Sequence, residues 1–169
     1  MNQAIAGVTP VEEREVQVTT VWPSIAVYGL GRQLGQLYQI AWPGVYIFRL
    51  GYLIALASIP IALVLYFLRV APGFGIRYVL TNRRVIEMRG MPPVESKSVE
   101  LDRFDEIEII TRSGDDWYHC GDLVFRKGGV ETFRLLAVSR PEVFRRTCLE
   151  AHMAYVGVKE ALERQGDAA

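Results

Sequence analysis

The chain has 169 residues, enough for one domain and an appendage. Its 19 basic and 19 acidic residues give a formal net charge of zero, so it lacks the basic excess of a protein that binds nucleic acid through bulk electrostatics, and we expect no nucleic-acid partner. Hydrophobic residues make up 50% of the chain, which indicates a local apolar block rather than a larger core. Two cysteines imply no disulfide scaffold.

The first part of the chain is predicted to be irregular and then extended. Residues 1–10 are expected to form a flexible N-terminus, and they lack the basic and apolar regions of a signal peptide. Residues 11–23 are expected to contain a strand, because Val16, Val18 and Thr20 alternate with other residues at a period of two.

Residues 24–72 are predicted to be a membrane segment. Arg49 and Arg69 enclose nineteen uncharged, mostly apolar residues, and a membrane-spanning helix needs ~20 such residues. We therefore expect a transmembrane helix over 44–70, with a kink at Pro60 that neighbouring helices would have to accommodate. The other interpretation, a buried core helix, is disfavoured by the length and apolarity of the run.

The stretch 24–42 is less apolar and has Arg32 as its only charge. It is predicted to be either an interfacial amphipathic helix or the first arm of a membrane hairpin that turns near Pro43. Gly31 and Gly35 have the small-residue spacing that permits close helix packing. If the strand in 11–23 joins a sheet formed later in the chain, both lie on one side of the membrane, which favours the hairpin or interfacial model over a single span.

Arginines after the apolar run set the expected orientation. The positive-inside rule places the C-terminal domain in the cytoplasm. The same side chains are candidate contacts for lipid headgroups, although they also fit a simple topology signal or ion pairs with Glu87 and Glu95. These four candidates are Arg77, Arg83, Arg84 and Arg89.

Residues 73–163 are predicted to form a mainly β domain of the α+β class, followed by a polar, flexible tail over 164–169. Short stretches alternate at a period of two and are separated by turn residues, which is typical of an antiparallel sandwich or barrel. We expect strands over 76–81, 84–88, 96–101, 105–111, 117–120, 122–126 and 130–136. A C-terminal helix follows, with a capping box at Ser139–Glu142 and an apolar stripe from Phe144 to Leu162 that should cover the sheet.

Two sets of residues suggest chemistry without completing a site. Cys148 and His152 lie at helical i, i+4 spacing, but adding one residue of the His119–Cys120 pair gives three ligands at most, without the paired spacing of structural zinc sites. Asp115, Asp116 and His119 resemble ordinary turn composition more than an acid–base set. We expect no metal, no cofactor and no enzymatic activity, because neither a nucleophile–base constellation nor a phosphate-binding loop is present.

The order of motifs resembles the bacterial pleckstrin-homology (PH-like) family. Tyr78–Ile86 is similar to the family's Y-x-L-T-N-x-R opening, and the later landmarks follow in order at Leu101–Ile107, Gly121–Phe125, Phe133–Leu136 and Ser139–Glu142. The resemblance implies a PH-like sandwich closed by a helix, membrane association in the bacterial cytoplasmic membrane, and often oligomerisation. We therefore expect a membrane-anchored binding or scaffold protein that contacts lipids and a protein partner or itself. The alternative is a structural subunit of a larger membrane complex.

Overall fold

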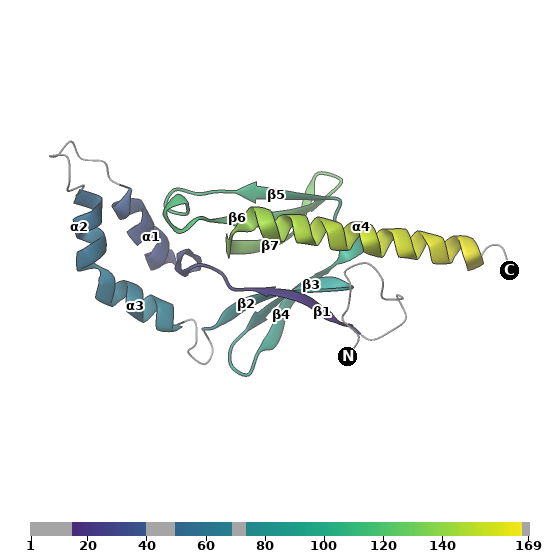
Figure 1. Cartoon of the computed structure of the whole chain (residues 1–169), viewed down its shortest axis with the longest axis horizontal. Coiled ribbons are helices and arrows are strands. Elements are labelled where there is room, and N and C mark those ends of the chain that lie inside the picture. The colour runs from purple at the N-terminus through teal and green to yellow at the C-terminus, as the bar shows by residue number, and fades with distance from the viewer. Residues whose placement is uncertain (1–14, 40–49, 69–73, 167–169) are drawn as a thin grey trace.

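The computed structural model describes residues 15–39, 50–68 and 74–166. Two antiparallel sheets pack face to face (Figure 1). The first sheet has the order β1-β2-β3-β4 and the second has the order β5-β6-β7. The strands are β1 (Gln17–Val21), β2 (Ile76–Thr81), β3 (Arg84–Arg89), β4 (Val94–Glu100), β5 (Glu106–Ile110), β6 (Cys120–Lys127) and β7 (Val130–Ser139).

The predicted mainly β fold with a C-terminal helix is confirmed, and the barrel alternative is wrong. The two sheets stay separate, and a single bridge between Pro23 and Val138 joins their edges within the described residues. The expected strand over 117–120 is also absent: a short 3-10 helix, η3 (Asp116–Tyr118), occupies this place, and β6 begins only at Cys120. His119 takes a left-handed conformation with φ 49°, which ends η3 and turns the chain into β6.

The core lies between the sheets and follows the alternation in the sequence. Tyr78 and Leu80 of β2 point inward, and the second sheet contributes Phe125. The ring of Phe104 contacts that of Phe125 edge to face, with 5.0 Å between centroids. The Tyr78 hydroxyl donates to the Leu136 carbonyl at 2.8 Å, so the one polar atom of this buried ring has a partner.

Helix α4 (Pro141–Gly166) seals the sandwich and then extends past it (Figure 1). Phe144 and Cys148 are buried, and Ala151 and Tyr155 pack against the same core, as the apolar stripe predicted. The side chain of Leu162 lies outside the described residues. The capping box is wrong: Ser139 pairs with Cys120 as the last residue of β7, and the helix begins at Pro141. The helix also continues to Gly166, into the tail that was expected to be irregular.

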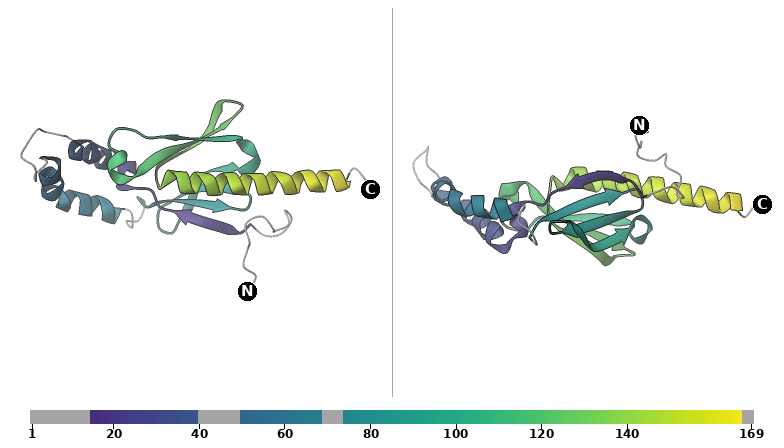
Figure 2. Two further views of the ribbon diagram at one scale, coloured as in Figure 1. Left: turned by 45° about the horizontal axis from the view of Figure 1, so that its top comes forward. Right: turned by 90° about the horizontal axis from the view of Figure 1, so that it is seen from below.

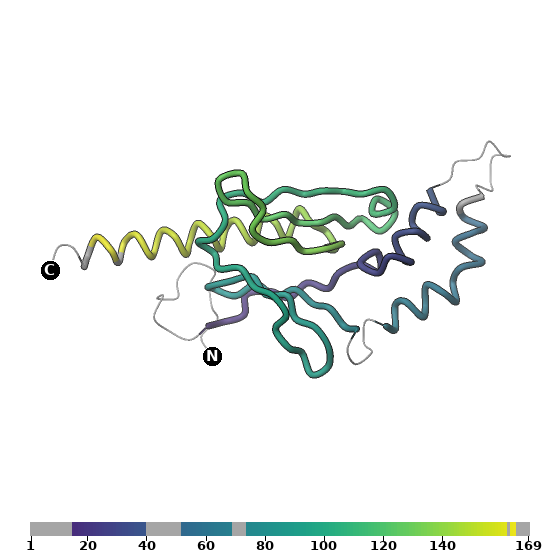
Figure 3. The backbone as a smooth tube through the Cα atoms, turned by 180° about the vertical axis from the view of Figure 1, so that it is seen from behind, coloured from purple at the N-terminus to yellow at the C-terminus, as the bar shows by residue number. Residues whose placement is uncertain are grey.

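A helical unit is inserted into the connection between β1 and β2. It consists of η1 (Ile25–Val27), α1 (Gly29–Tyr38), α2 (Leu50–Ala57) and α3 (Ile59–Leu68). Because β1 pairs directly with β2, with Val21 opposite Tyr78, the chain leaves the sheet and returns to it at the same end. The unit projects from this end, opposite the C-terminal half of α4 (Figures 2 and 3). The strand expected within 11–23 is thus present and joins the sheet.

The single helix expected over 44–70 is wrong. Residues 44–49 and 69–70 lie outside the described residues, and the part between them forms α2 and α3, which are about 12 and 15 Å long. Within the described ranges, no helix is both long enough and apolar enough to cross a membrane. Two features account for the break, one long-range and one local. The hydroxyls of Ser58 and Tyr38 are hydrogen-bonded, and Pro60 has no N–H with which to continue the α2 ladder, so it sits in the first turn of a new helix.

Candidate functional site

The outer surface of α2 and α3 is apolar and exposed. Leu56 is 65% exposed, and Val64 and Phe67 are each 62% exposed. Neither helix contains a charged residue. A contiguous apolar surface of this extent is typical of a protein- or membrane-interaction site. We call it the apolar helical surface; its exposed members are Tyr52, Leu53, Leu56, Ile59, Ile61, Leu63, Val64, Tyr66 and Phe67.

The inner side of these helices packs against α1 and η3. Leu34, Tyr38 and Leu65 form a small buried cluster. The ring of Trp117 in η3 contacts Tyr38 at a centroid distance of 5.2 Å and Tyr52 at 6.0 Å. The helical unit and η3 therefore share a small core that is separate from the main core, and the apolar helical surface lies outside this small core.

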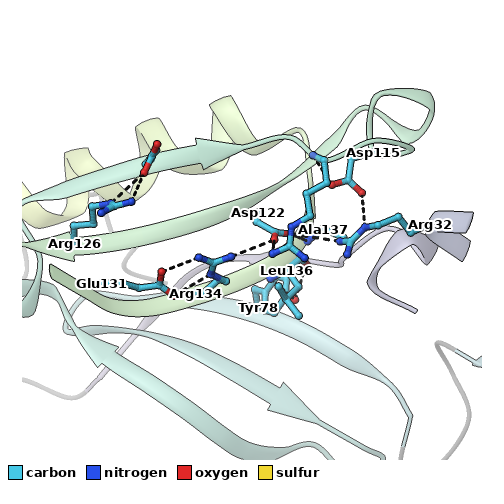
Figure 4. Close-up of polar contacts among 11 residues, drawn as sticks. Arg32, Tyr78, Asp115, Asp122, Arg126, Glu131, Arg134, Leu136 and Ala137 are labelled. Atoms are coloured by element: carbon cyan, nitrogen blue, oxygen red, sulfur yellow. Dashed lines mark hydrogen bonds and ion pairs between the residues drawn. The ribbon is translucent and has the colours of Figure 1, made fainter. Parts of the chain in front are cut away.

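A buried charge cluster joins the helical unit to the second sheet (Figure 4). Nε of Arg32 in α1 donates to Oδ1 of Asp115 at 3.1 Å, and Nη2 lies 3.7 Å from Oδ1 of Asp122. Both carboxylates are fully buried. A buried carboxylate is costly unless it is paired, so Arg32 and the two aspartates hold α1 against the β5–β6 connection.

The remaining members of this cluster balance its charge. Nη2 of Arg112 lies 2.7 Å from Oδ2 of Asp122, and Arg134 lies 3.9 Å from the same oxygen while it also pairs with Glu131. Oδ1 of Asp122 accepts a hydrogen bond from the Ala137 amide at 2.9 Å. Three arginines thus face three carboxylates. The cluster has no excess charge with which to attract a ligand, and we interpret it as a structural joint.

Sequence reasoning missed this joint. The sequence pattern presents Arg32 as the single charge of its segment, and Asp115 as a turn residue whose acid–base role is disfavoured. One signal was available, because an arginine within an apolar segment needs a carboxylate or backbone partner. The identity of that partner depends on a contact across 83 positions in sequence, which no local pattern reveals.

Glycines allow α1 to approach the β5–β6 connection closely. A Cβ at Gly35 would collide with the carbonyl oxygen of Gly114 and with the ring of Tyr118. Gly114 itself has φ +92°, which favours glycine, and a Cβ there would approach the Arg32 carbonyl. The predicted small-residue spacing thus serves packing of α1 on a loop of the sandwich, in addition to contact with η1 through Gly31.

The four candidate arginines lie at opposite ends of the first sheet. Arg77 is the second residue of β2, opposite Met88 of β3, and Arg89 ends β3, so these two lie at the end that carries the helical unit. Arg83 and Arg84 lie at the far end, where Arg83 is in the β2–β3 turn and Arg84 begins β3. Strand geometry therefore separates two pairs that are close in sequence.

The contacts of these arginines also differ. Arg84 pairs with Glu15 at 2.8 Å and with Glu95 at 2.9 Å, and its hydrogen bond to Glu15 lowers the pKa of that carboxyl. Arg89 pairs with the buried Glu87 at 2.7 Å, although its side chain remains 52% exposed. Nη2 of Arg77 contacts Sδ of Met88 at 3.5 Å, and no carboxylate of the described residues lies within ion-pair distance of it.

The candidate chemical residues do not assemble into a site. Asp115 is buried and paired with Arg32, whereas Asp116 and His119 are exposed. Cys148 is in the main core, and Nδ1 of His152 lies 2.6 Å from the Leu101 carbonyl oxygen. No group of three potential metal ligands occurs among residues 15–39, 50–68 and 74–166. Burial raises the pKa of the Cys120 thiol to about 11, with Asp115 adding to the shift, so this thiol is a poor nucleophile at neutral pH.

An open cavity of about 370 Å³ lies between β1 and the first turns of α4. Trp22 and Val143 contribute exposed apolar surface, and Arg140 contributes a positive charge. This groove lies between the edge strand of the first sheet and the helix that seals the sandwich.

Fold and surface together define a PH-like sandwich with an apolar helical unit inserted after its first strand. The family model described as "Bacterial PH domain" matches residues 32–152, well over half of the chain, so the chain belongs to the bacterial PH domain family. The resemblance drawn from the sequence motifs is confirmed, and the match extends further toward the N-terminus: it begins at Arg32, within α1, and includes α2 and α3. PH domains are in general non-catalytic binding modules. No curated protein matches the chain, and no solved structure matches it.

Proposed function

We propose that this chain is a membrane-anchored, non-enzymatic binding protein in which the helical unit inserts into the bilayer and the PH-like sandwich contacts a partner. The observation that carries the proposal is the apolar helical surface. Fully burying one Val, Leu, Ile or Phe side chain is worth about 1.5–3 kcal/mol, so a surface of nine large, half-exposed apolar residues favours a non-aqueous environment strongly.

Lipid fits this surface better than a soluble protein partner does. The helices α2 and α3 contain no charged or amide side chain with which to specify a protein interface, and arginines at positions 49 and 69 flank the run in sequence. Long basic side chains at the ends of an apolar segment are suited to the headgroup layer. Tyr52 and Tyr66 are amphipathic and suit the same layer.

The pairing of β1 with β2 supports a re-entrant anchor. The segments before and after the helical unit share one sheet and therefore lie on the same side of any membrane. A single crossing between them is incompatible with this pairing. We propose that α2 and α3 enter and leave the same face of the bilayer, and that the sandwich is cytoplasmic, as the arginines that follow the apolar run indicate.

The sandwich supplies the binding role in this proposal. Its described residues contain no assembled acid–base, nucleophile or metal set, and PH domains are in general binding modules. We propose a protein partner or a second copy of the chain as its contact, and membrane lipids as the contact of the helical unit.

The anchor is tested by fractionating cells that produce the full chain. The proposal predicts that the protein sediments with membranes and resists extraction by high salt and by alkaline carbonate. Reporters fused to the two ends should both be cytoplasmic. Release by salt alone, or ends on opposite sides of the membrane, contradicts the proposal.

The same membranes separate the two functional alternatives. A homogeneous detergent-solubilised species that binds partners reversibly supports an anchored binding protein. Stoichiometric co-purification with other membrane subunits, and loss of the chain in their absence, supports a structural subunit instead.

A further inference from the structure

The β3–β4 hairpin lies at the same end of the sandwich as the helical unit. In the antiparallel order β1-β2-β3-β4, the β1–β2 and β3–β4 connections share one end. The Gly90 amide donates to the Gly75 carbonyl at 2.7 Å, which places the hairpin tip directly beside the segment that follows the helical unit. The same segment is also held by Tyr28 of the helical unit, whose hydroxyl donates to the Phe74 carbonyl at 3.0 Å.

Exposed apolar side chains gather at this tip. Phe74 and Met91 are each 59% exposed, and Val94 is 64% exposed. Arg77 and Arg89 stand next to them in the β2–β3 ladder, where Ile76 pairs with Arg89. Glu95 follows Val94 and brings a negative charge close to the tip. Arg84 offsets this charge, because the Glu95 carboxylate pairs with Arg84 at 2.9 Å, and it also accepts a hydrogen bond from Ser98 at 2.7 Å. The tip thus presents apolar residues with basic residues close behind.

We infer that the β3–β4 tip is a second membrane contact, with Phe74, Met91 and Val94 entering the headgroup region of an anionic bilayer and Arg77 and Arg89 meeting its phosphates. The inference rests on the proposed membrane anchor and gives the sandwich a fixed tilt. The occupant is a lipid surface because the tip lies at the same end of the molecule as the helical unit that carries the apolar helical surface (Figures 1 and 3).

This tilt assigns different roles to the two arginine pairs. Arg77 and Arg89 lie at the membrane end of the sheet, whereas Arg83 and the backbone of Arg84 lie at the end that carries the β2–β3 turn, and the charge of Arg84 is already paired with Glu15 and Glu95. A basic residue close to an anionic leaflet contributes ~1 kcal/mol, which is about a fivefold change in binding. Only the first pair should therefore respond to the anionic lipid content.

The test uses an environment-sensitive fluorophore on single introduced cysteines of the full chain. Met91→Cys reports the tip, Val64→Cys reports the helical anchor, and Val130→Cys, at the far β6–β7 hairpin, is the control. The native Cys120 and Cys148 are buried, so labelling is confined to the introduced thiols. Vesicles of phosphatidylcholine with phosphatidylglycerol should shift the emission at positions 64 and 91 to the blue and leave position 130 unchanged.

Each other outcome has one meaning. A blue shift at 64 without one at 91 overturns the tip contact and leaves the anchor intact. No shift at either position overturns the anchor as well. In the same vesicles, Arg77→Gln should weaken binding about fivefold, and Arg89→Gln should weaken it by a smaller factor because Glu87 offsets part of the Arg89 charge. Arg103→Gln, at the far end of the sheet, should not; equal losses for all three variants contradict the inference.

Discussion

The guanidinium of Arg32 and the carboxylate of Asp115 are 3.1 Å apart and come from positions 83 residues apart in sequence. Asp115 is fully buried, and the side chain of Arg32 is 20% exposed. This pair holds the helical unit to the sandwich. If the helical unit is an anchor, the same pair determines how the sandwich is presented at the membrane.

Removing Arg32 should therefore be costly. Arg32→Ala leaves two buried aspartates with one fewer partner, and breaking a buried pair from one side costs about 3–5 kcal/mol. Arg146→Ala is the matched control, because Arg146 is 73% exposed and its pair with Glu150, at 4.0 Å, is worth ~0–1 kcal/mol. Urea unfolding in mild detergent measures both. Equal decreases in the free energy of unfolding for the two variants would show that Arg32 contributes no more than a surface charge does.

Two glycines of α1 provide a second test of this joint. Gly35→Ala places a methyl group against the Gly114 carbonyl, and overpacking of this kind costs about 1–3 kcal/mol. Gly29→Ala meets open space in the same helix and should be neutral or stabilising by up to ~1 kcal/mol, since alanine is the better helix former. Thermal melts compare the two, and Trp117 fluorescence reports displacement of α1. A stabilising Gly35→Ala would contradict the close approach.

Helix α4 should be required for the stability of the sandwich. Phe144 is 2% exposed, so Phe144→Ala should lower the free energy of unfolding by about 3–5 kcal/mol. The adjacent Val143 is 54% exposed, and Val143→Ala should change it by less than about 0.5 kcal/mol. Chemical denaturation of the two variants measures the difference. Similar values would mean that α4 does not seal the core.

The Cys120 thiol should make stability depend on alkaline pH. Burial raises its pKa from 9.0 to about 11, so the folded state holds the proton more tightly than the unfolded state does. This contribution is complete below about pH 9 and is lost as the pH rises through about 11. The difference between the urea midpoints of the wild type and of Cys120→Ala should be constant below about pH 9. Above that pH, the midpoint of the wild type should fall relative to that of the variant. A constant difference throughout would show that Cys120 titrates normally when folded.

The sandwich was largely predictable because its determinants are local. Alternation at a period of two predicted most of the strands, and turn residues predicted the breaks between them, as at the β6–β7 turn, where Gly128 and Gly129 have positive φ. The apolar stripe of α4 predicted its buried face. The start of α4 was missed because the β6–β7 ladder continues through Ser139, and a pairing partner is not visible in the local pattern.

The helical unit was less predictable because long-range contacts shape it. Hydropathy alone predicts one continuous helix over 44–70. The break at Ser58 depends on the Tyr38 hydroxyl, which comes from another helix, together with Pro60. The headgroup candidates are close to the apolar run in sequence, whereas the fold places Arg77 and Arg84 at opposite ends of a sheet.

The most direct measurement of the central claim, that the apolar helical surface binds lipid, is flotation of the full chain with phospholipid vesicles. The wild type should float and should remain bound in high salt. Val64→Asp should lower partitioning about a hundredfold, because an acidic residue at the centre of an apolar membrane helix costs about 2.5–3.5 kcal/mol. Val130→Asp, at an equally exposed valine of the β6–β7 hairpin, should float like the wild type. A wild type that stays with the unbound fraction, or a Val64→Asp variant that floats equally well, would contradict the account.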